Sequence, residues 1–315
     1  MEKLKLFFAD NFERILVLTI ILGAASINYW VPYKFGFLNF FYLPVLMAGY
    51  YTSKRFTVLT AILCILVVIF FTLAFPNFIL DEMKTPFAII GLLSWSCFLL
   101  LTSAVIGYLY EEKEARIKDL KAAYIGILEI LSKYLESYDQ YTQGHSVRVA
   151  HLSEEIAREM GLPHIQVENI KAAALLHDIG KTEISMDIIH KATRLSNTER
   201  DEVNTHSERG ARILTLVDSV LKDAIPLVIA HHKYYFTQDN KDKKDIDTIP
   251  LGAAVIAVAD AYDAIITDRP YRAGKQPWKA FEEIEQASGK QFHPDTVKAL
   301  KRVLMFNKKY TEETP

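Results

Sequence analysis

The stretch at residues 172–181, AAALLHDIGK, decides how the second half of this chain folds. Its run of alanine and leucine is typical of a buried helix, and His177 and Asp178 follow that run directly. Burying a carboxylate without a partner costs several kcal/mol. A metal ion would supply the missing partner. The stretch therefore predicts a metal site at the end of a buried helix.

More histidines and aspartates recur on both sides of this pair, in segments of helical periodicity. A capping signal at Ser196 and Glu199 begins one of these helices. The candidate ligands are His145, His177, Asp178, His206, His231, His232 and Asp260. A single buried histidine is more often a hydrogen-bonded core residue, but this many in helical settings favour one shared centre. Neutral imidazole and carboxylate suit iron, manganese, zinc and other divalent ions.

Residues 138–304 resemble the HD-GYP branch of the HD phosphohydrolases. The segments that carry the resemblance are YTQGHSVRVAHL, LLHDIGK, HSERGARIL, IAHH and IPLGAAVIAVADAYDAIITDRPYR. The resemblance implies an all-helical domain with a metal centre in its core. It assigns the seven candidate ligands to metal binding, with Asp178 bridging two ions. Some members carry a third metal and a Glu where this chain has Tyr141, so we expect two divalent ions here, iron or manganese.

The resemblance also implies a reaction. The family's usual substrate is cyclic di-GMP, which is opened to pGpG or carried on to GMP. Lys181, Arg269 and Arg272 match the residues that hold substrate phosphates, although surface ion pairing is the alternative for the two arginines. Two close divalent ions can lower the pKa of a bridging water for attack on phosphorus. We therefore expect a metal-dependent phosphodiesterase in which Asp178 and Lys181 are catalytic.

One loop departs from the family pattern. After the paired histidines the family usually continues to the Gly-Tyr-Pro that gives it its name, and this chain has Asp239, Asn240 and Lys241 in that slot. No candidate ligand is lost with the motif. Two alternatives to cyclic di-GMP hydrolysis stay open: hydrolysis of another nucleotide, and a membrane receptor whose HD domain binds a nucleotide or a partner protein with little turnover.

The first third of the chain reads as a membrane domain. Four apolar segments, at residues 15–31, 36–51, 58–75 and 87–110, are predicted to cross the bilayer as helices, and the second contains Pro44. Lys54 and Arg55 lie between the second and third segments, and further basic residues precede the first and follow the fourth. Because cytoplasmic loops are rich in Lys and Arg, we expect both termini and the catalytic domain on the cytoplasmic side of the inner membrane.

The predicted domains are a transmembrane domain at 1–110, a helical stalk at 111–137 and an HD-type catalytic domain at 138–315. The stalk has apolar residues at spacings of three and four, namely Ile117, Leu120, Tyr124, Leu128, Leu131 and Leu135. This stripe could pair with the same stripe of a second chain to form a homodimer. The alternative is that its later part packs on its own catalytic domain.

Composition limits what the chain can bind. The net charge is −2, so no basic face argues for a nucleic acid polymer. The two cysteines, Cys64 and Cys97, both lie in apolar runs of the first third, far from the histidines. Any metal in the second half must therefore use histidine and carboxylate ligands.

Overall fold

The computed structural model describes residues 11–30, 34–74, 85–137, 144–189, 191, 196–236, 249–268 and 273–306. Within these ranges the regular structure is helical, with one isolated bridge between Ser288 and Phe292 and no β-strand. The predicted all-helical fold is therefore confirmed. The chain divides into two compact units, Met1–Lys121 and Ala122–Pro315, and the division falls inside the predicted stalk.

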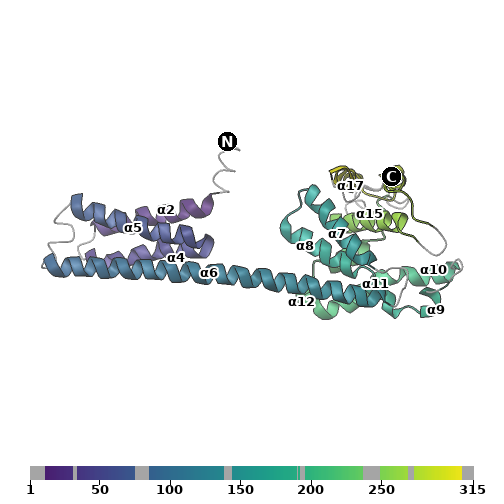
Figure 1. The fold of residues 1–315 in the computed structure, drawn as a ribbon, viewed down its shortest axis with the longest axis horizontal. Helices are drawn as coiled ribbons and strands as arrows, with labels where there is room; N and C mark the ends of the chain where they lie inside the picture. Colours follow the sequence, from purple (N-terminus) through teal and green to yellow (C-terminus); the bar gives the residue numbers. More distant parts are fainter. Residues whose placement is uncertain are drawn as a thin grey trace. The chain divides into compact units, whose positions relative to one another are not determined.

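Apolar helices that share one core form the first unit (Figure 1). They are α2 (Phe12–Trp30), α3 (Lys34–Phe37), η1 (Leu38–Phe41), α4 (Tyr42–Tyr51), α5 (Lys54–Ala74) and the first part of α6 (Thr85–Glu136). Val17 of α2, Cys64 of α5 and Leu99 of α6 are all buried in that core. The indole nitrogen of Trp95 donates a hydrogen bond to the carbonyl oxygen of Leu38 at 3.1 Å, which ties α6 to η1.

The predicted four-span bundle is only partly supported. Among the described residues two helices are long and apolar enough to cross a membrane, namely α5 and the Pro86–Glu136 part of α6. The predicted span at 36–51 is not one regular helix, because it is divided among α3, η1 and α4. The 10 residues of α4 rise about 15 Å, roughly half of a bilayer core. The prediction of one regular membrane-spanning helix at 36–51 was therefore wrong.

The apolar side chains of these two helices largely face outward. Only 28% of the apolar window of α5 and 17% of that of α6 are buried inside the protein. Phe70 of α5 is 64% exposed, and Leu93 of α6 is 66% exposed. Contiguous apolar surface of this kind marks a site of contact with membrane or protein, so the pattern agrees with membrane association.

The later part of α6 packs into the second unit. Leu128 is buried there, and Tyr124, Ile125 and Leu135 pack partly buried against the same core. The side chains of Tyr124, Leu128 and Leu135 that were predicted to meet a second chain are therefore used within the chain itself. The alternative prediction, packing on the chain's own domain, describes this face of the helix correctly.

The remaining helices of the second unit enclose the core that surrounds the candidate ligands. They are α7 (His145–Glu159), α8 (His164–Leu176), η3 (Ile179–Glu183), α9 (Met186–Ile189), α10 (Asn197–Asn204), α11 (His206–Leu214), η4 (Thr215–Val217), α12 (Asp218–Leu221), α13 (Ile225–Ala230), α15 (Leu251–Ile266), α16 (Pro277–Gln286) and α17 (Pro294–Phe306). Ile156 of α7, Leu176 of α8, Ile256 of α15 and Leu300 of α17 are fully buried. The capping box predicted at Ser196 is confirmed at the start of α10.

One glycine permits a close approach that the site needs. A Cβ added to Gly180 of η3 would lie 2.0 Å from the carbonyl oxygen of His206 and 2.5 Å from the nitrogen of Gly210. No side chain larger than hydrogen fits there, because real Cβ contacts never come so close. The glycine in HDIGK therefore lets the turn after His177 and Asp178 lie directly against α11.

Candidate metal centre

The candidate ligands lie mostly at helix ends. His145 is the first residue of α7 and His206 the first of α11, whereas His177 follows the last residue of α8 and His231 the last of α13. Asp260 lies within α15. Helix ends leave backbone groups without intrahelical partners. In this domain the ends of separate helices also bring the candidate ligands to one place.

Backbone carbonyls orient three of the imidazoles in the same way. The Nδ1 atom of His177 lies 2.8 Å from the carbonyl oxygen of Ala174. The Nδ1 atoms of His206 and His231 lie 2.6 Å from the carbonyl oxygens three residues before them. Nδ1 must donate in each contact, so the Nε2 lone pair is left for another partner. Metal-binding histidines are typically oriented by such a bond from the second ring nitrogen.

The Nε2 atoms then converge. Nε2 of His206 lies 3.4 Å from Nε2 of His231 and 3.2 Å from Nε2 of His232. Two ligands on one ion, each bound at about 2.1 Å, are separated by roughly 3.0–3.4 Å. In His206 and His231 both Nδ1 atoms donate to carbonyls, so both Nε2 atoms are acceptors. Two acceptors gain nothing by facing each other at 3.4 Å, and this pair therefore fits a cation held between them.

Three overlapping groups place one ligand atom from each member within 4.8 Å of the others. The groups are His206, His231 and His232; His145, His177 and Asp260; and His177, Asp178 and His231. Together they contain all seven residues that the sequence indicated as ligands. The described residues thus form a cluster that could bind metal ions.

Asp178 lies between the first two groups. Its Oδ2 is 3.5 Å from Nε2 of His177, and its Oδ1 is 3.4 Å from Nε2 of His206. Lys181 Nζ lies 2.5 Å from the same Oδ2. Burial opposes ionisation of Asp178, but Lys181 and the nearby imidazoles outweigh burial and hold its pKa well below the usual range. The carboxylate is therefore ionised.

His145 is held by two carboxylates. Its Nε2 lies 3.2 Å from Oδ1 of Asp260, and its Nδ1 lies 2.8 Å from Oδ2 of Asp263. Burial lowers the pKa of His145, but its hydrogen bonds with Asp260 and Asp263 outweigh burial and raise the pKa to about 10. Nε2 faces the centre, and Nδ1 faces away from it.

Asp263 was not identified from the sequence. It is buried and also accepts two hydrogen bonds from Arg148, at 2.6 Å from Nε and 2.9 Å from Nη2. Its carboxylate therefore fixes the imidazole of His145 and balances the charge of Arg148, which lies on the same helix as His145. The sequence does contain a signal, because Asp263 follows Asp260 by three residues and so lies on the same helix face.

Burial favours the neutral form of three of the other candidate ligands, His206, His231 and His232. Burial lowers the pKa of His206 to about 4, although Asp178 opposes the shift. Burial, together with the neighbouring imidazoles, also lowers the pKa values of His231 and His232. Metal ligands must be unprotonated, so these side chains are in the required state at neutral pH.

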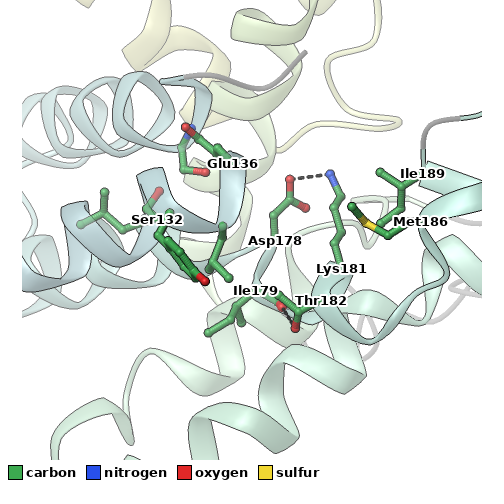
Figure 2. A pocket seen from close by; sticks show the side chains of 12 residues that line it. Ser132, Glu136, Asp178, Ile179, Lys181, Thr182, Met186 and Ile189 are labelled. Carbon is green, nitrogen blue, oxygen red and sulfur yellow. Dashed lines mark hydrogen bonds and ion pairs between the residues drawn. The ribbon is translucent and has the colours of Figure 1, made fainter. Parts of the chain in front are cut away.

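Two cavities approach the cluster. One, of about 460 Å³, is lined by the last turns of α6, by Asp178 and Lys181, and by apolar residues including Ile179, Met186 and Ile189. Figure 2 shows Asp178 and Lys181 across this cavity from Ser132 and Glu136 of α6. The other, of about 540 Å³, is lined by His231, His232, Lys233 and Asp260 among others. The cluster is therefore reachable by a ligand larger than an ion.

Several residues singled out from the sequence lie outside the described ranges. They are Arg269 and Arg272, the loop residues Asp239, Asn240 and Lys241, and Tyr141. The predicted phosphate-binding role of the two arginines therefore stays a prediction. Of the three predicted phosphate-binding residues, Lys181 is described, and it lies beside Asp178.

The fold and the cluster together define an all-helical domain with a histidine and aspartate metal centre. The sequence profile of the HD domain matches residues 129–296, more than half of the chain, and the chain belongs to this family. The resemblance to HD phosphohydrolases that the motifs indicated is confirmed.

Curated relatives carry the same region. The chain is 36% identical over 178 residues to a cyclic di-GMP phosphodiesterase of Thermotoga maritima, an alignment that covers 55% of this chain and 47% of that protein. It is 35% identical to a cyclic di-GMP phosphodiesterase of Pseudomonas aeruginosa, over 51% of this chain and 38% of the relative. It is also 32% identical to a 3'3'-cGAMP-specific phosphodiesterase of Vibrio cholerae, over 56% of this chain and 38% of that protein. The chain thus spans about half, or less, of the length of each relative.

Proposed function

We propose that the chain is a membrane-anchored, metal-dependent phosphodiesterase that hydrolyses cyclic di-GMP. Water adds across one P–O bond to give linear pGpG, and a second hydrolysis gives two molecules of GMP. The observation that carries the proposal is the position of Asp178, which lies between two groups of histidines, with Lys181 beside it and a cavity in front. This arrangement suits binding of ions and of a phosphate together.

The proposed ligand set is His145, His177, Asp178, His206, His231, His232 and Asp260, holding two ions with Asp178 shared between them. Iron and manganese suit these donors. When bound, two divalent ions supply an activated water and neutralise phosphoryl oxygens. Asp178 and Asp260 contribute negative charge, and the five imidazoles contribute nitrogen donors. Metal dependence is the general property of HD phosphohydrolases, and two ions of this kind are our specific proposal.

Lys181 is proposed to hold a phosphoryl oxygen. Its ammonium already lies at the carboxylate of Asp178, on the wall of the 460 Å³ cavity. A lysine acts there as a point charge that stabilises negative charge as it develops on phosphate. Arg269 and Arg272 are proposed from the sequence to serve the same phosphates with bidentate contacts. The carboxylate of Asp178 remains available to the ions.

Cyclic di-GMP is proposed as substrate because two of the relatives are named as phosphodiesterases of that dinucleotide. Another cyclic dinucleotide is the second candidate, since a further relative is named as specific for 3'3'-cGAMP. The altered loop at Asp239–Lys241 bears on this choice. If the loop limits turnover, replacing it by Gly-Tyr-Pro will raise the rate with cyclic di-GMP, whereas an unchanged rate would exclude that limit.

The test is turnover by the purified full chain, prepared without oxygen and assayed for bound metals. Each dinucleotide is followed by chromatography, with the variant His177→Ala/Asp178→Ala as control. Metal-dependent conversion of cyclic di-GMP that is absent in the control would support the proposal. Preference for 3'3'-cGAMP would support the second candidate. A metal-free chain without turnover would favour the receptor alternative, in which the domain binds and does not hydrolyse.

We also propose that the first unit anchors the chain in the inner membrane with both termini in the cytoplasm. The outward-facing apolar surfaces of α5 and α6 support the anchor. Basic residues that flank the apolar segments support the orientation. A reporter fused to the carboxyl terminus that is active only in the cytoplasm tests it, and a reporter active only outside the membrane would reverse the orientation.

A homodimer is proposed through a face of α6 that we call the outer face, formed by the exposed residues Ile127, Ile130 and Tyr134. These positions recur at intervals of three and four, as in a helix that pairs with another. They replace Tyr124, Leu128 and Leu135 of the predicted stripe, which pack inside the second unit.

A further inference from the structure

Glu136 is the last residue of α6, and its buried carboxylate binds the start of another helix. One oxygen accepts a hydrogen bond from the backbone nitrogen of Gly144, and the other accepts one from that of Ser146, both at 2.6 Å. The first amides of a helix have no acceptor within the helix. The N-cap residue of α7, Gly144, has no side chain to supply one. Glu136 therefore caps α7 from a different helix.

The residue between the two capped amides is His145. Its imidazole is fixed on the other side by Asp263, which is itself bound by Arg148 from the next turn of α7. The first turn of α7 is thus held at two places, at its backbone by Glu136 and at its side chain by Asp263. Loss of the first contact would leave the backbone of His145 free to shift relative to Asp260.

The helix that ends at Glu136 is itself held in place. Leu128 and Leu135 pack into the core of the second unit, and the last turns also form one wall of the cavity that contains Asp178 and Lys181 (Figure 2). Any shift of this end of α6 along or about its axis would move the acceptor of the α7 amides. It would reshape the cavity wall at the same time.

We propose that Glu136 is a positioning residue that couples the end of α6 to the metal group of His145, His177 and Asp260. The carboxylate holds His145 at the place where its Nε2 faces Asp260. Displacement of the end of α6 weakens this group and leaves the group of His206, His231 and His232 intact. The inference rests on the proposed function for the role of His145 as a ligand.

The first experiment is a titration of the purified full chain with Mn²⁺, in which free Mn²⁺ is counted by electron paramagnetic resonance. In Glu136→Gln an amide replaces one acceptor oxygen and faces a backbone N–H. We expect one of the bound ions to be held about tenfold more weakly, since changes behind a ligand typically cost 10–100-fold in affinity. Glu129→Gln, two turns earlier on α6, is the matched control and should bind as the parent does. Equal affinities in Glu136→Gln and the parent would overturn the inference.

A double-mutant cycle separates positioning from a general effect on folding. His145→Ala removes the ligand through which Glu136 is proposed to act, so adding Glu136→Gln to it should lower Mn²⁺ affinity no further. A further loss in the double variant, or weaker binding at the His206 group, would show a merely structural cap and overturn the inference. If Glu136→Gln does not fold, Glu136→Asp, which keeps the carboxylate on a shorter side chain, enters the same cycle.

These readouts do not depend on the substrate. A chain that binds Mn²⁺ as described and leaves cyclic di-GMP intact would overturn the proposed substrate and leave the coupling through Glu136 standing. If the chain hydrolyses cyclic di-GMP but the effects of Glu136→Gln and His145→Ala on Mn²⁺ affinity are additive, only the proposed coupling through Glu136 would be overturned.

Discussion

Lys181 is a residue whose proposed role can be separated from metal binding. Its ammonium lies at Asp178 and carries no lone pair for an ion while it is protonated. In Lys181→Met we expect the metal content to remain, and turnover to fall about 100-fold, the usual cost of removing one preorganised charge donor. Metal analysis and kinetics on one preparation measure both.

The control is Lys222→Met, an exposed lysine distant in sequence from the ligands. It should leave both the metal content and turnover unchanged. Loss of metal in Lys181→Met would mean that the lysine maintains the ligand arrangement and would contradict a role confined to phosphate.

Gly180 tests the close approach of η3 to α11. Ala at this position would force its Cβ against the carbonyl oxygen of His206. Overpacking of this kind costs about 1–3 kcal/mol, so Gly180→Ala should lower the unfolding temperature and weaken binding at the His206 group. Calorimetry and Mn²⁺ titration measure the two effects.

The matched control for Gly180 is Gly126→Ala in α6, where an added Cβ meets nothing within 4 Å. Ala in a helix interior is favoured over Gly by roughly 0.5–1 kcal/mol, so this variant should be as stable as the parent or more so. A Gly180→Ala protein with an unchanged unfolding temperature and unchanged metal binding would show that η3 can move away from α11 without cost.

A functional residue can be predicted from the sequence only if its residue type is unusual for its position. The seven candidate ligands could be found because costly polar groups recur in apolar helices, and the structure brings them together. Glu136 could not be found, because it looks like an ordinary acidic residue in the sequence, and for Asp263 the only signal is its spacing of three residues from Asp260. Their partners, His145 and the amides of α7, are fixed only once the helices pack.

At the scale of elements, α7 and α8 are joined by a charged contact that should depend on pH. Glu154 of α7 lies 2.7 Å from Lys171 Nζ of α8 and also binds Arg158. Burial raises the pKa of Glu154, but the hydrogen bonds from Lys171 and Arg158 outweigh it and lower the pKa. A lowered pKa stabilises the fold above the unfolded value of about 4.3. That contribution is lost as the pH falls through the folded value.

We therefore expect Glu154→Gln to be less stable than the parent by about 1 kcal/mol at pH 7. Below about pH 4.3 the difference should narrow, because the parent carboxylate becomes protonated. Urea unfolding of the metal-free chain at both pH values measures it, with the exposed Glu282→Gln as control. If the stability difference between Glu154→Gln and the parent widened at low pH, the lowered pKa of Glu154 could not be assigned to Lys171 and Arg158.

The outer face of α6 can be tested with one charge. Ile130 is 70% exposed on this face, and a lysine there would meet its symmetry mate across a helix pair. We expect the parent to be dimeric in detergent and Ile130→Lys to be monomeric by light scattering. Glu129→Lys changes the charge beside the face and should stay dimeric. A monomeric parent would rule out the proposed dimer.

Helix content was predicted well from periodicity, and helix boundaries were not. The segment at 36–51 has the composition of a span, yet it divides at Phe37 and Phe41 into three short helices. Composition reports how apolar a segment is and says little about where its hydrogen bonding changes from one helix type to another. In the stalk, one apolar pattern permitted both a second chain and the chain's own core as partner. Only packing could decide which residues meet which.

At the scale of the whole molecule, the sequence divides into an apolar part and a polar part, and the structure divides into two compact units. One helix, α6, has residues in both: it begins at Thr85 and continues without a break to Glu136. The second unit accounts for the family membership, because the HD-domain match begins at residue 129, within α6.

The position of the histidines at helix ends has a consequence for the lifetime of the protein in a cell. Ions held by His145, His177, His206 and His231 would join the starts of α7 and α11 to the ends of α8 and α13, four termini from distant parts of the chain. Binding free energy of this kind is also folding free energy. A cell short of the trace metal would then lose the protein itself to its proteases, because the opened chain is what they cleave. Nutrient supply would set how much of the protein exists, as well as how fast it works.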